Sequence, residues 1–130
     1  MYETGTATHV RAFHVMPGLP PPEGERHAHD YRFDVVVRGD GLDERGMVVD
    51  LDVLDAALRA TAGAVDGADL DELIGGVVGA PAVTVELFAR WVHARLAAAL
   101  APLPGAVLAV RVWESAVAFG GYAAAVDPAP

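Results

Sequence analysis

His27-Ala28-His29 is the stretch around which the chain is organised, because it leads into a predicted strand from Tyr31 to Arg38. Side chains two apart point to the same face of an extended chain, so His27 and His29 would project together. With a third imidazole from a neighbouring strand, they form a three-nitrogen cap that suits zinc and leaves a fourth position for water or substrate. A pair of surface histidines explains the same short spacing, and the spacing alone leaves both interpretations open.

Alternating polarity predicts a strand on each side of a proline-rich loop. Residues 2–14 alternate in this way and end at His14. The loop at 16–26 contains four prolines and two glycines, which exclude a regular element. The second strand begins at Tyr31, with the histidine pair at its entrance. Its apolar face consists of Tyr31, Phe33, Val35 and Val37.

Two helices are predicted in the middle of the chain. Asp50 and Thr84 are the expected N-caps, because their side-chain oxygens can accept hydrogen bonds from the first N–H groups of a helix. The segment between the helices, 66–81, is glycine-rich and acidic, and is predicted to be a loop with an irregular turn around 70–74. The first helix should bury Leu51, Leu54, Leu58 and Val65, and the second Leu87, Trp91, Leu96 and Leu100.

Two further strands, at 107–114 and 118–126, complete the order strand, strand, helix, helix, strand, strand. This order predicts an α+β fold in which a four-stranded antiparallel sheet carries both helices on one face. Such a sheet has two open edges, so we expect copies of the chain to join into an oligomer. The whole chain, 1–130, is interpreted as one domain, with a tail at 127–130 that is expected to fray.

Composition restricts the classes of function. The net charge of −9 argues against nucleic acid as a partner, since nucleic-acid-binding proteins need a basic surface. The chain has no cysteine, which excludes disulfides, cysteine zinc ligands and a cysteine nucleophile. We find neither a signal peptide nor an apolar run long enough to span a membrane, and therefore predict a cytoplasmic protein without a membrane partner.

Five motifs resemble the 6-pyruvoyl-tetrahydropterin synthase family, which includes 6-carboxy-tetrahydropterin synthase of queuosine biosynthesis. They are Ala12-Phe13-His14, His27-Ala28-His29-Asp30-Tyr31, Gly46-Met47-Val48-Val49-Asp50-Leu51, Thr84-Val85-Glu86 and Val112-Trp113-Glu114-Ser115. With the order of elements, the resemblance covers nearly the whole chain. It implies a T-fold, or tunnelling fold, in which sheets join into a trimeric barrel and two trimers stack into a hexamer. It also implies active sites at the subunit interfaces.

The resemblance implies a zinc site. His14, His27 and His29 match the family's three zinc ligands. Ala28 replaces the glycine of the family's His-Gly-His motif, a change of one methyl group that need not disturb the ligands.

The resemblance further implies a substrate-binding set. Glu114 matches the glutamate that anchors the pterin, and a carboxylate suits that edge because it offers two acceptors to two N–H donors. Thr84 and Glu86 match the family's Pro-Thr-x-Glu stretch, with Val83 in the place of proline. Simpler interpretations remain open, namely a charge at a strand end for Glu114, and a helix cap and a first-turn acid for Thr84 and Glu86.

Two catalytic positions depart from the family pattern. The family's catalytic cysteine, four residues before His-Gly-His, is Glu23 here, and its Asp-His pair after the first helix reads Asp66-Gly67. Glu23 can replace the cysteine as a base, because burial raises the pKa of a glutamate toward neutrality. A branch of the family with glutamate in or beside this position is associated with side-chain cleavage to a hydroxymethyl-pterin. Glu25 competes for the role, and a solvated loop glutamate is the simpler interpretation of Glu23.

No residue evidently replaces the missing histidine of the Asp-His pair. Asp66 keeps the carboxylate of the pair, but Asp66, Asp69 and Asp71 lie in a glycine-rich loop where carboxylates are expected to be solvated. His93 is expected at the surface or at an interface rather than in a catalytic role.

The sequence therefore predicts a zinc-dependent carbon–oxygen or carbon–carbon lyase or cyclase. Its substrate would be a dihydropterin or another small heterocyclic or carbonyl compound, handled by altered acid–base residues. The alternative is a catalytically inactive relative that binds zinc and a pterin-like ligand, or that serves as an assembly partner. Intact zinc ligands together with Glu114 favour the enzyme, whereas the lost cysteine and histidine favour inactivity or a changed reaction. We favour a changed reaction.

Overall fold

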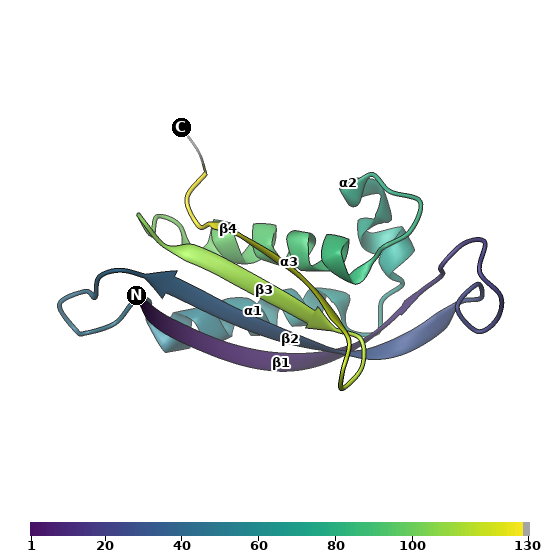
Figure 1. Ribbon diagram of the computed structural model, residues 1–130, viewed down its shortest axis with the longest axis horizontal. Helices are drawn as coiled ribbons and strands as arrows, with labels where there is room; N and C mark the ends of the chain where they lie inside the picture. The colour runs from purple at the N-terminus through teal and green to yellow at the C-terminus, as the bar shows by residue number, and fades with distance from the viewer. Residues whose placement is uncertain (129–130) are drawn as a thin grey trace.

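The computed structural model describes residues 1–128 and confirms the predicted α+β class (Figure 1). The strands form one antiparallel sheet in the order β1-β2-β3-β4, and the two long helices, α1 and α3, pack on the same face of it. The elements are β1 (Tyr2–His14), β2 (His27–Gly39), α1 (Leu51–Val65), η1 (Asp71–Gly75), α2 (Gly76–Val78), α3 (Val85–Leu100), β3 (Val107–Trp113) and β4 (Phe119–Ala125). None of the helices within residues 1–128 is long and apolar enough to cross a membrane.

The core lies between the sheet and the two long helices. The predicted apolar face of β2 is buried, and its rings at Tyr31 and Phe33 meet the ring of Phe88 edge-on, at centroid distances of 5.1 and 5.2 Å. Edge-to-face contacts of this kind add to the free energy gained from burial. Burial of each large apolar side chain contributes about 1.5–3 kcal/mol, so this face fixes how the helices sit on the sheet.

Both predicted helix caps are present. The carboxylate of Asp50 accepts a hydrogen bond from the N–H of Asp52 at 2.8 Å, and the hydroxyl of Thr84 accepts one from the N–H of Leu87 at 3.2 Å. Each cap satisfies a backbone donor that has no partner within its helix.

The predicted apolar faces of the helices need correction. Leu51 begins α1 and is 48% exposed, so it does not belong to the core. In α3, Leu87 and Trp91 were expected to face the core. Both are only half-buried, although Trp91 packs against the core. The buried residues of α3 include a four-residue repeat of Phe88, Val92, Leu96 and Leu100, the last two as predicted, with Ala89 and His93 beside it. A four-residue repeat keeps its members on one helix face, which the predicted spacing did not.

The sheet is uneven at the end that carries the histidines. β1 and β2 pair along their full lengths, from Tyr2 with Gly39 to His14 with His27. The pairing of β2 with β3 begins only at Arg32. Among the described residues, 1–128, β1 is therefore the only strand beside residues 27–31. β2 starts at His27 rather than at the predicted Tyr31 because β1 continues beside it.

The segment that follows α1 lies along the outer edge of β1. The N–H of Gly67 donates to the carbonyl oxygen of Arg11 at 2.6 Å, and the N–H of Phe13 donates to that of Ala68 at 2.9 Å. The irregular turn predicted around 70–74 is helical and forms η1. Figure 1 shows this segment, the proline-rich loop and the β3–β4 turn at the same end of the sheet.

The expected solvation of the three loop aspartates holds for Asp66, which is exposed, but not for Asp69 and Asp71, which are half-buried. Asp66 accepts a hydrogen bond from the N–H of Arg11 at 3.0 Å, and Asp71 accepts one from the N–H of Val15 at 2.9 Å. Asp69 forms an ion pair with Arg26. The carboxylates thus satisfy donors from β1, from Val15 and from the end of the loop 16–26, which their local composition does not reveal.

β4 and Asp127 form hydrogen bonds with neighbouring elements. His93, expected at the surface or at an interface, is buried in α3, and its Nε2–H donates to the carbonyl oxygen of Ala124 at 3.1 Å. Asp127 accepts a hydrogen bond from the N–H of Leu103 at 2.9 Å. Residues 129–130 of the tail predicted to fray lie outside the described residues.

Candidate metal centre

His14, His27 and His29 converge at the uneven end of the sheet. His14 and His27 form the last pair of the β1–β2 ladder, and His29 is the next residue of β2 on the same face. One ring nitrogen from each histidine lies within 4.8 Å of the other two. The alternation of side chains along a strand thus brings the three predicted ligands together.

Hydrogen bonds on one side of two rings leave the opposite nitrogen free. The Nδ1 atom of His14 lies 3.1 Å from the carbonyl oxygen of Val83, and that of His27 lies 2.8 Å from the carbonyl oxygen of Glu25. A carbonyl only accepts hydrogen bonds, so both Nδ1 atoms carry a proton, and in the neutral ring each Nε2 atom keeps its lone pair. Bonds of this kind fix the tautomer and the ring orientation of histidines that bind metals.

The Nε2 atoms of the three histidines have few hydrogen-bond partners in the protein. The Nε2 atom of His14 is buried and has no hydrogen-bond partner among residues 1–128. The Nε2 atoms of His27 and His29 are 3.1 Å apart, close enough to share a proton or to contact one ion. A buried polar atom without a partner costs about 1–3 kcal/mol, and a cation between the rings removes that cost.

Electrostatics favour neutral imidazole at His29, the form that binds metals. Burial lowers the pKa of His29, and the proximity of His14 lowers it further, whereas Glu114 acts in the opposite direction. Three neutral imidazoles with converging lone pairs are a donor set suited to Zn²⁺. The residues present therefore fit a zinc ion.

The histidines open into a cavity of about 360 Å³ that gathers most of the predicted site residues. Glu23 reaches it from the loop 16–26, Thr84 and Glu86 from the start of α3, and Glu114 from the residue after β3. The loop is closed by a hydrogen bond from the N–H of Met16 to the carbonyl oxygen of Glu23 at 2.8 Å. The cavity thus combines imidazole nitrogens with carboxylates from three separate segments.

Gly120 allows the start of α3 to approach β4. A Cβ atom at this position would lie 2.6 Å from the side chain of Val85 and 2.8 Å from the backbone nitrogen of Glu86. Contacts this short are not tolerated, so only glycine permits the observed packing. This packing holds Glu86 at the cavity.

A second, larger cavity of about 800 Å³ shares His29 and Glu114 with the first. It opens on the uncovered face of the sheet, where the carboxylate of Asp34 accepts hydrogen bonds from Trp113 Nε1–H at 2.7 Å and from Arg32 Nε–H at 2.9 Å. The indole and the guanidinium are therefore held in place by one carboxylate. The sequence carries no local signal for this group, because its three members come from two strands.

Tyr31 is a further residue of the site that the sequence analysis assigned only to the core. Its ring lies beside those of His14 and His29, at centroid distances of 6.3 and 5.4 Å. Burial raises the pKa of the Tyr31 hydroxyl, and the carboxylates of Glu114 and Asp71 raise it further. The phenol therefore stays protonated, and its uncharged ring packs against His14 and His29.

Asp66 is the one predicted site residue that the structure does not bring to the cavity of its own chain. Its carboxylate is bound to the N–H of Arg11, and it does not line either of the two cavities. Gly67, the next residue, donates its N–H to the carbonyl oxygen of Arg11.

A four-stranded antiparallel sheet with two helices on one face and a histidine cluster at its uneven end defines a T-fold domain with a candidate metal centre. The sequence model of the 6-pyruvoyl tetrahydropterin synthase family matches residues 5–124, and the chain belongs to this family. No curated protein gives a significant match.

Solved structures of the same family share the fold at low sequence identity. The Caenorhabditis elegans 6-pyruvoyl tetrahydropterin synthase has a TM-score of 0.74 and 19% identity, over 95% of this chain and 96% of that chain. The Plasmodium falciparum protein has a TM-score of 0.73 and 11% identity, over 95% and 98%. A Plasmodium vivax 6-pyruvoyltetrahydropterin synthase in which a catalytic glutamate is replaced by alanine has a TM-score of 0.71 and 13% identity, over 95% and 98%.

Proposed function

We propose that this chain is a zinc-dependent lyase or cyclase that acts on a dihydropterin or another small heterocyclic or carbonyl compound. The observation that carries the proposal is the buried, unpartnered Nε2 of His14, which faces two further imidazoles in a cavity that also holds carboxylates. Membership of the 6-pyruvoyl tetrahydropterin synthase family, whose enzymes are lyases, supports this class of reaction.

The three histidines would hold the zinc ion. His14 and His27 would bind it through Nε2, because their Nδ1–H groups are committed to the carbonyl oxygens of Val83 and Glu25. Bound there, zinc would supply Lewis acidity toward a substrate carbonyl or hydroxyl oxygen. The protein's contribution is a set of rings whose orientation is fixed in advance, which lowers the cost of assembling the site.

Glu114 would hold the heterocycle. Its carboxylate lies where the two cavities meet and can accept two hydrogen bonds from an amino group and an adjacent ring N–H. The hydroxyl of Thr84 already accepts the capping bond from Leu87, but its hydrogen can still be donated to a substrate oxygen. Glu86 offers a further acceptor in the same cavity.

Glu23 would move the proton that the family's cysteine moves. It lines the same cavity as the histidines, so its carboxylate can reach a substrate carbon or hydroxyl beside the metal. The Plasmodium vivax relative, in which a glutamate is catalytic, supports this role for a glutamate within the family.

The chain would work as a hexamer formed by two stacked trimers. Within residues 1–128, β4 has no strand on its outer side, and no ladder covers the outer edge of β1 before Arg11. Antiparallel pairing of β4 with β1 of the next copy would continue the sheet into a barrel and remove both open edges. Asp66 is bonded at the β1 edge, so the neighbouring copy's Asp66 would come close to the turn after Glu114 and complete the catalytic set.

The second candidate function is that of an inactive relative that binds zinc and a pterin-like ligand or serves as an assembly partner. The observation that favours it is Gly67, which cannot move a proton and stands where the family has a histidine.

The cytoplasmic location remains a prediction from the sequence.

Incubation of the zinc-loaded protein with dihydroneopterin triphosphate, followed by mass spectrometry of the products, tests the proposal. A pyruvoyl, carboxy or hydroxymethyl pterin that is absent with His29→Ala would support a lyase of this family. Tight pterin binding with zinc in place and no product would favour the inactive relative.

A further inference from the structure

Two of the three histidines stand at the least supported place in the sheet. His14 and His27 form the final pair of the β1–β2 ladder, and β3 does not extend to this level. An isolated pair of strands is only marginally stable, so its last residues tend to fray. A metal centre nevertheless needs its ligands held to within about 0.5 Å. Some other part of the chain must therefore hold this end.

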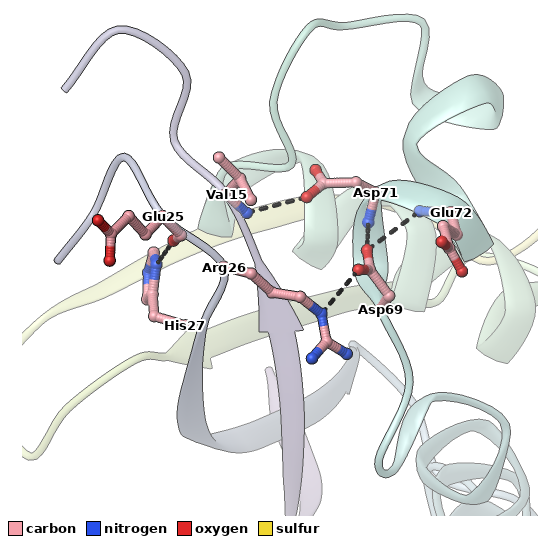
Figure 2. A network of polar contacts seen from close by, with 7 residues as sticks. All are labelled: Val15, Glu25, Arg26, His27, Asp69, Asp71 and Glu72. Atoms are coloured by element: carbon pink, nitrogen blue, oxygen red, sulfur yellow. Dashed lines mark hydrogen bonds and ion pairs between the residues drawn. The ribbon is translucent and has the colours of Figure 1, made fainter. Parts of the chain in front are cut away.

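The chain on both sides of His14 is bonded to the segment after α1. Directly after His14, the N–H of Val15 donates to Asp71 Oδ2 at 2.9 Å (Figure 2). Directly before it, the N–H of Phe13 donates to the carbonyl oxygen of Ala68 at 2.9 Å. The segment 66–71 thus takes the place of a third strand at this end of the sheet.

The residue before His27 is bonded to the same segment. Figure 2 shows the guanidinium of Arg26 directed at Asp69, and its Nε–H donates to Asp69 Oδ2 at 3.1 Å. The guanidinium also lies 4.2 Å from the centroid of the Phe13 ring, which adds a cation–π contact to β1. Arg26 therefore connects the start of β2 to both the end of β1 and the segment after α1.

Asp69 and Asp71 are held as one unit. Asp69 Oδ1 accepts hydrogen bonds from the N–H of Asp71 at 3.0 Å and from that of Glu72 at 3.3 Å (Figure 2). Burial opposes ionisation of Asp69, but the bonds from Arg26 and from the two N–H groups outweigh it and lower the pKa of the carboxyl group. The carboxylate is therefore charged at neutral pH.

We propose that Asp69, Asp71 and Arg26 form a clamp that positions His14 and His27 for metal binding. The inference rests on the proposed zinc site. None of the three lines the cavity of the histidines. Asp71 accepts a hydrogen bond from the backbone directly after His14, and Asp69 binds the side chain of Arg26, the residue directly before His27. Asp69 and Asp71 are therefore positioning residues rather than ligands or catalytic residues.

The clamp is local rather than part of the core that holds the fold. Its side chains lie outside the buried apolar cluster, which is formed by the sheet and the two long helices. Its loss should therefore loosen the ends that carry His14 and His27 while the rest of the fold stays intact. This distinction separates a positioning role from a general effect on stability.

The test uses the full chain and compares clamp variants with a matched ion pair. Asp69→Asn and Arg26→Gln remove the ion pair, Asp71→Ala removes the acceptor for Val15, and Asp71→Asn keeps a carbonyl oxygen there. Glu3→Gln is the control, because Glu3 and Arg38 pair at 2.8 Å across the same two strands at the opposite end. The first measurement is zinc affinity by competition with a chromophoric chelator, and the second is hydrogen exchange of the Val15 amide in metal-free protein.

We expect Asp69→Asn, Arg26→Gln and Asp71→Ala to weaken zinc binding by about tenfold or more. Asp71→Asn and Glu3→Gln should stay close to the unmodified chain. Exchange at Val15 should be faster in Asp71→Ala only. Each clamp variant removes one polar contact, so it should lower the thermal unfolding midpoint by no more than Glu3→Gln does.

Clamp variants that bind zinc as tightly as the control, with unchanged exchange at Val15, would overturn the clamp and leave the proposed function standing. An unmodified chain that binds no zinc would overturn the proposed function and the clamp together.

Discussion

The Nδ1 atom of His14 lies 3.1 Å from the carbonyl oxygen of Val83, the residue immediately before the cap of α3. This bond joins a metal-binding ring on β1 to the helix start that carries Thr84 and Glu86. The orientation of the candidate ligand and the position of the proposed substrate-binding residues therefore depend on the same contact. Val83 is itself buried, which keeps water away from the bond.

Glu114→Gln should weaken the binding of a pterin. Glutamine would present an amide donor to the donor edge of a pterin and lose the charge that strengthens two hydrogen bonds. We expect affinity for pterin, measured by calorimetry, to fall about 100-fold, since each bond to a charged group contributes about 1.5–3 kcal/mol. Zinc content should not change. Unchanged affinity would show that the anchor lies elsewhere, and Glu44→Gln, on an exposed loop, is the control.

The proton-transfer role of Glu23 is tested by Glu23→Gln. Glutamine fills the same space but cannot accept a proton, so turnover should fall by about 10²–10⁴ while zinc and pterin still bind. Turnover is measured as product formed per unit time by mass spectrometry. Glu25→Gln distinguishes the two glutamates, because the observed contact of Glu25 with His27 uses only its backbone carbonyl. Full turnover by Glu23→Gln with loss in Glu25→Gln would reverse the assignment.

The buried stripe of α3 predicts which side chain matters for stability. Phe88→Ala should reduce the free energy of unfolding by about 3–5 kcal/mol, because it removes the ring that meets Tyr31 and Phe33. Leu87→Ala, at the neighbouring half-buried position, should cost clearly less. Chemical denaturation gives both values. Equal losses at the two positions would contradict the observed face of the helix.

The ion pair of Asp69 and Arg26 should give stability a defined pH dependence. The folded-state pKa of Asp69 lies below its ordinary value of 3.8, so its stabilising effect is complete above that value. The effect is lost as the pH falls through the lowered folded-state pKa, because the unfolded state then binds the proton first. The unfolding free energies of the unmodified chain and Asp69→Asn should therefore differ at pH 7 and converge in acid. A difference that persists unchanged in acid would exclude this cause.

Much of the fold could be predicted because its elements follow simple patterns. The alternation of apolar residues in β1 and β2 and the caps at Asp50 and Thr84 depend only on neighbouring residues. The convergence of the histidines could be predicted for the same reason, since His27 and His29 share a face and His14 ends the strand beside them.

The remaining features depend on contacts between distant segments. The hydrogen bonds of Asp69 and Asp71 join residues more than 40 positions apart, to Arg26 and Val15, which local composition cannot indicate. The predicted apolar stripe of α3 was one position off at Leu87 and Trp91, because the faces on both sides of the buried one also carry apolar side chains. Asp66 could be assigned a role but not a location, since its partner lies on β1.

The central claim is that the three histidines bind zinc, and zinc content measures it most directly. Each purified chain is stripped with a chelator, reloaded with zinc, freed of excess metal and measured by inductively coupled plasma mass spectrometry. We predict one zinc per chain in the unmodified protein and in His9→Ala, whose histidine is on the opposite sheet face, and none in His27→Ala. Full zinc content in His27→Ala, or none in the unmodified protein, would contradict the account.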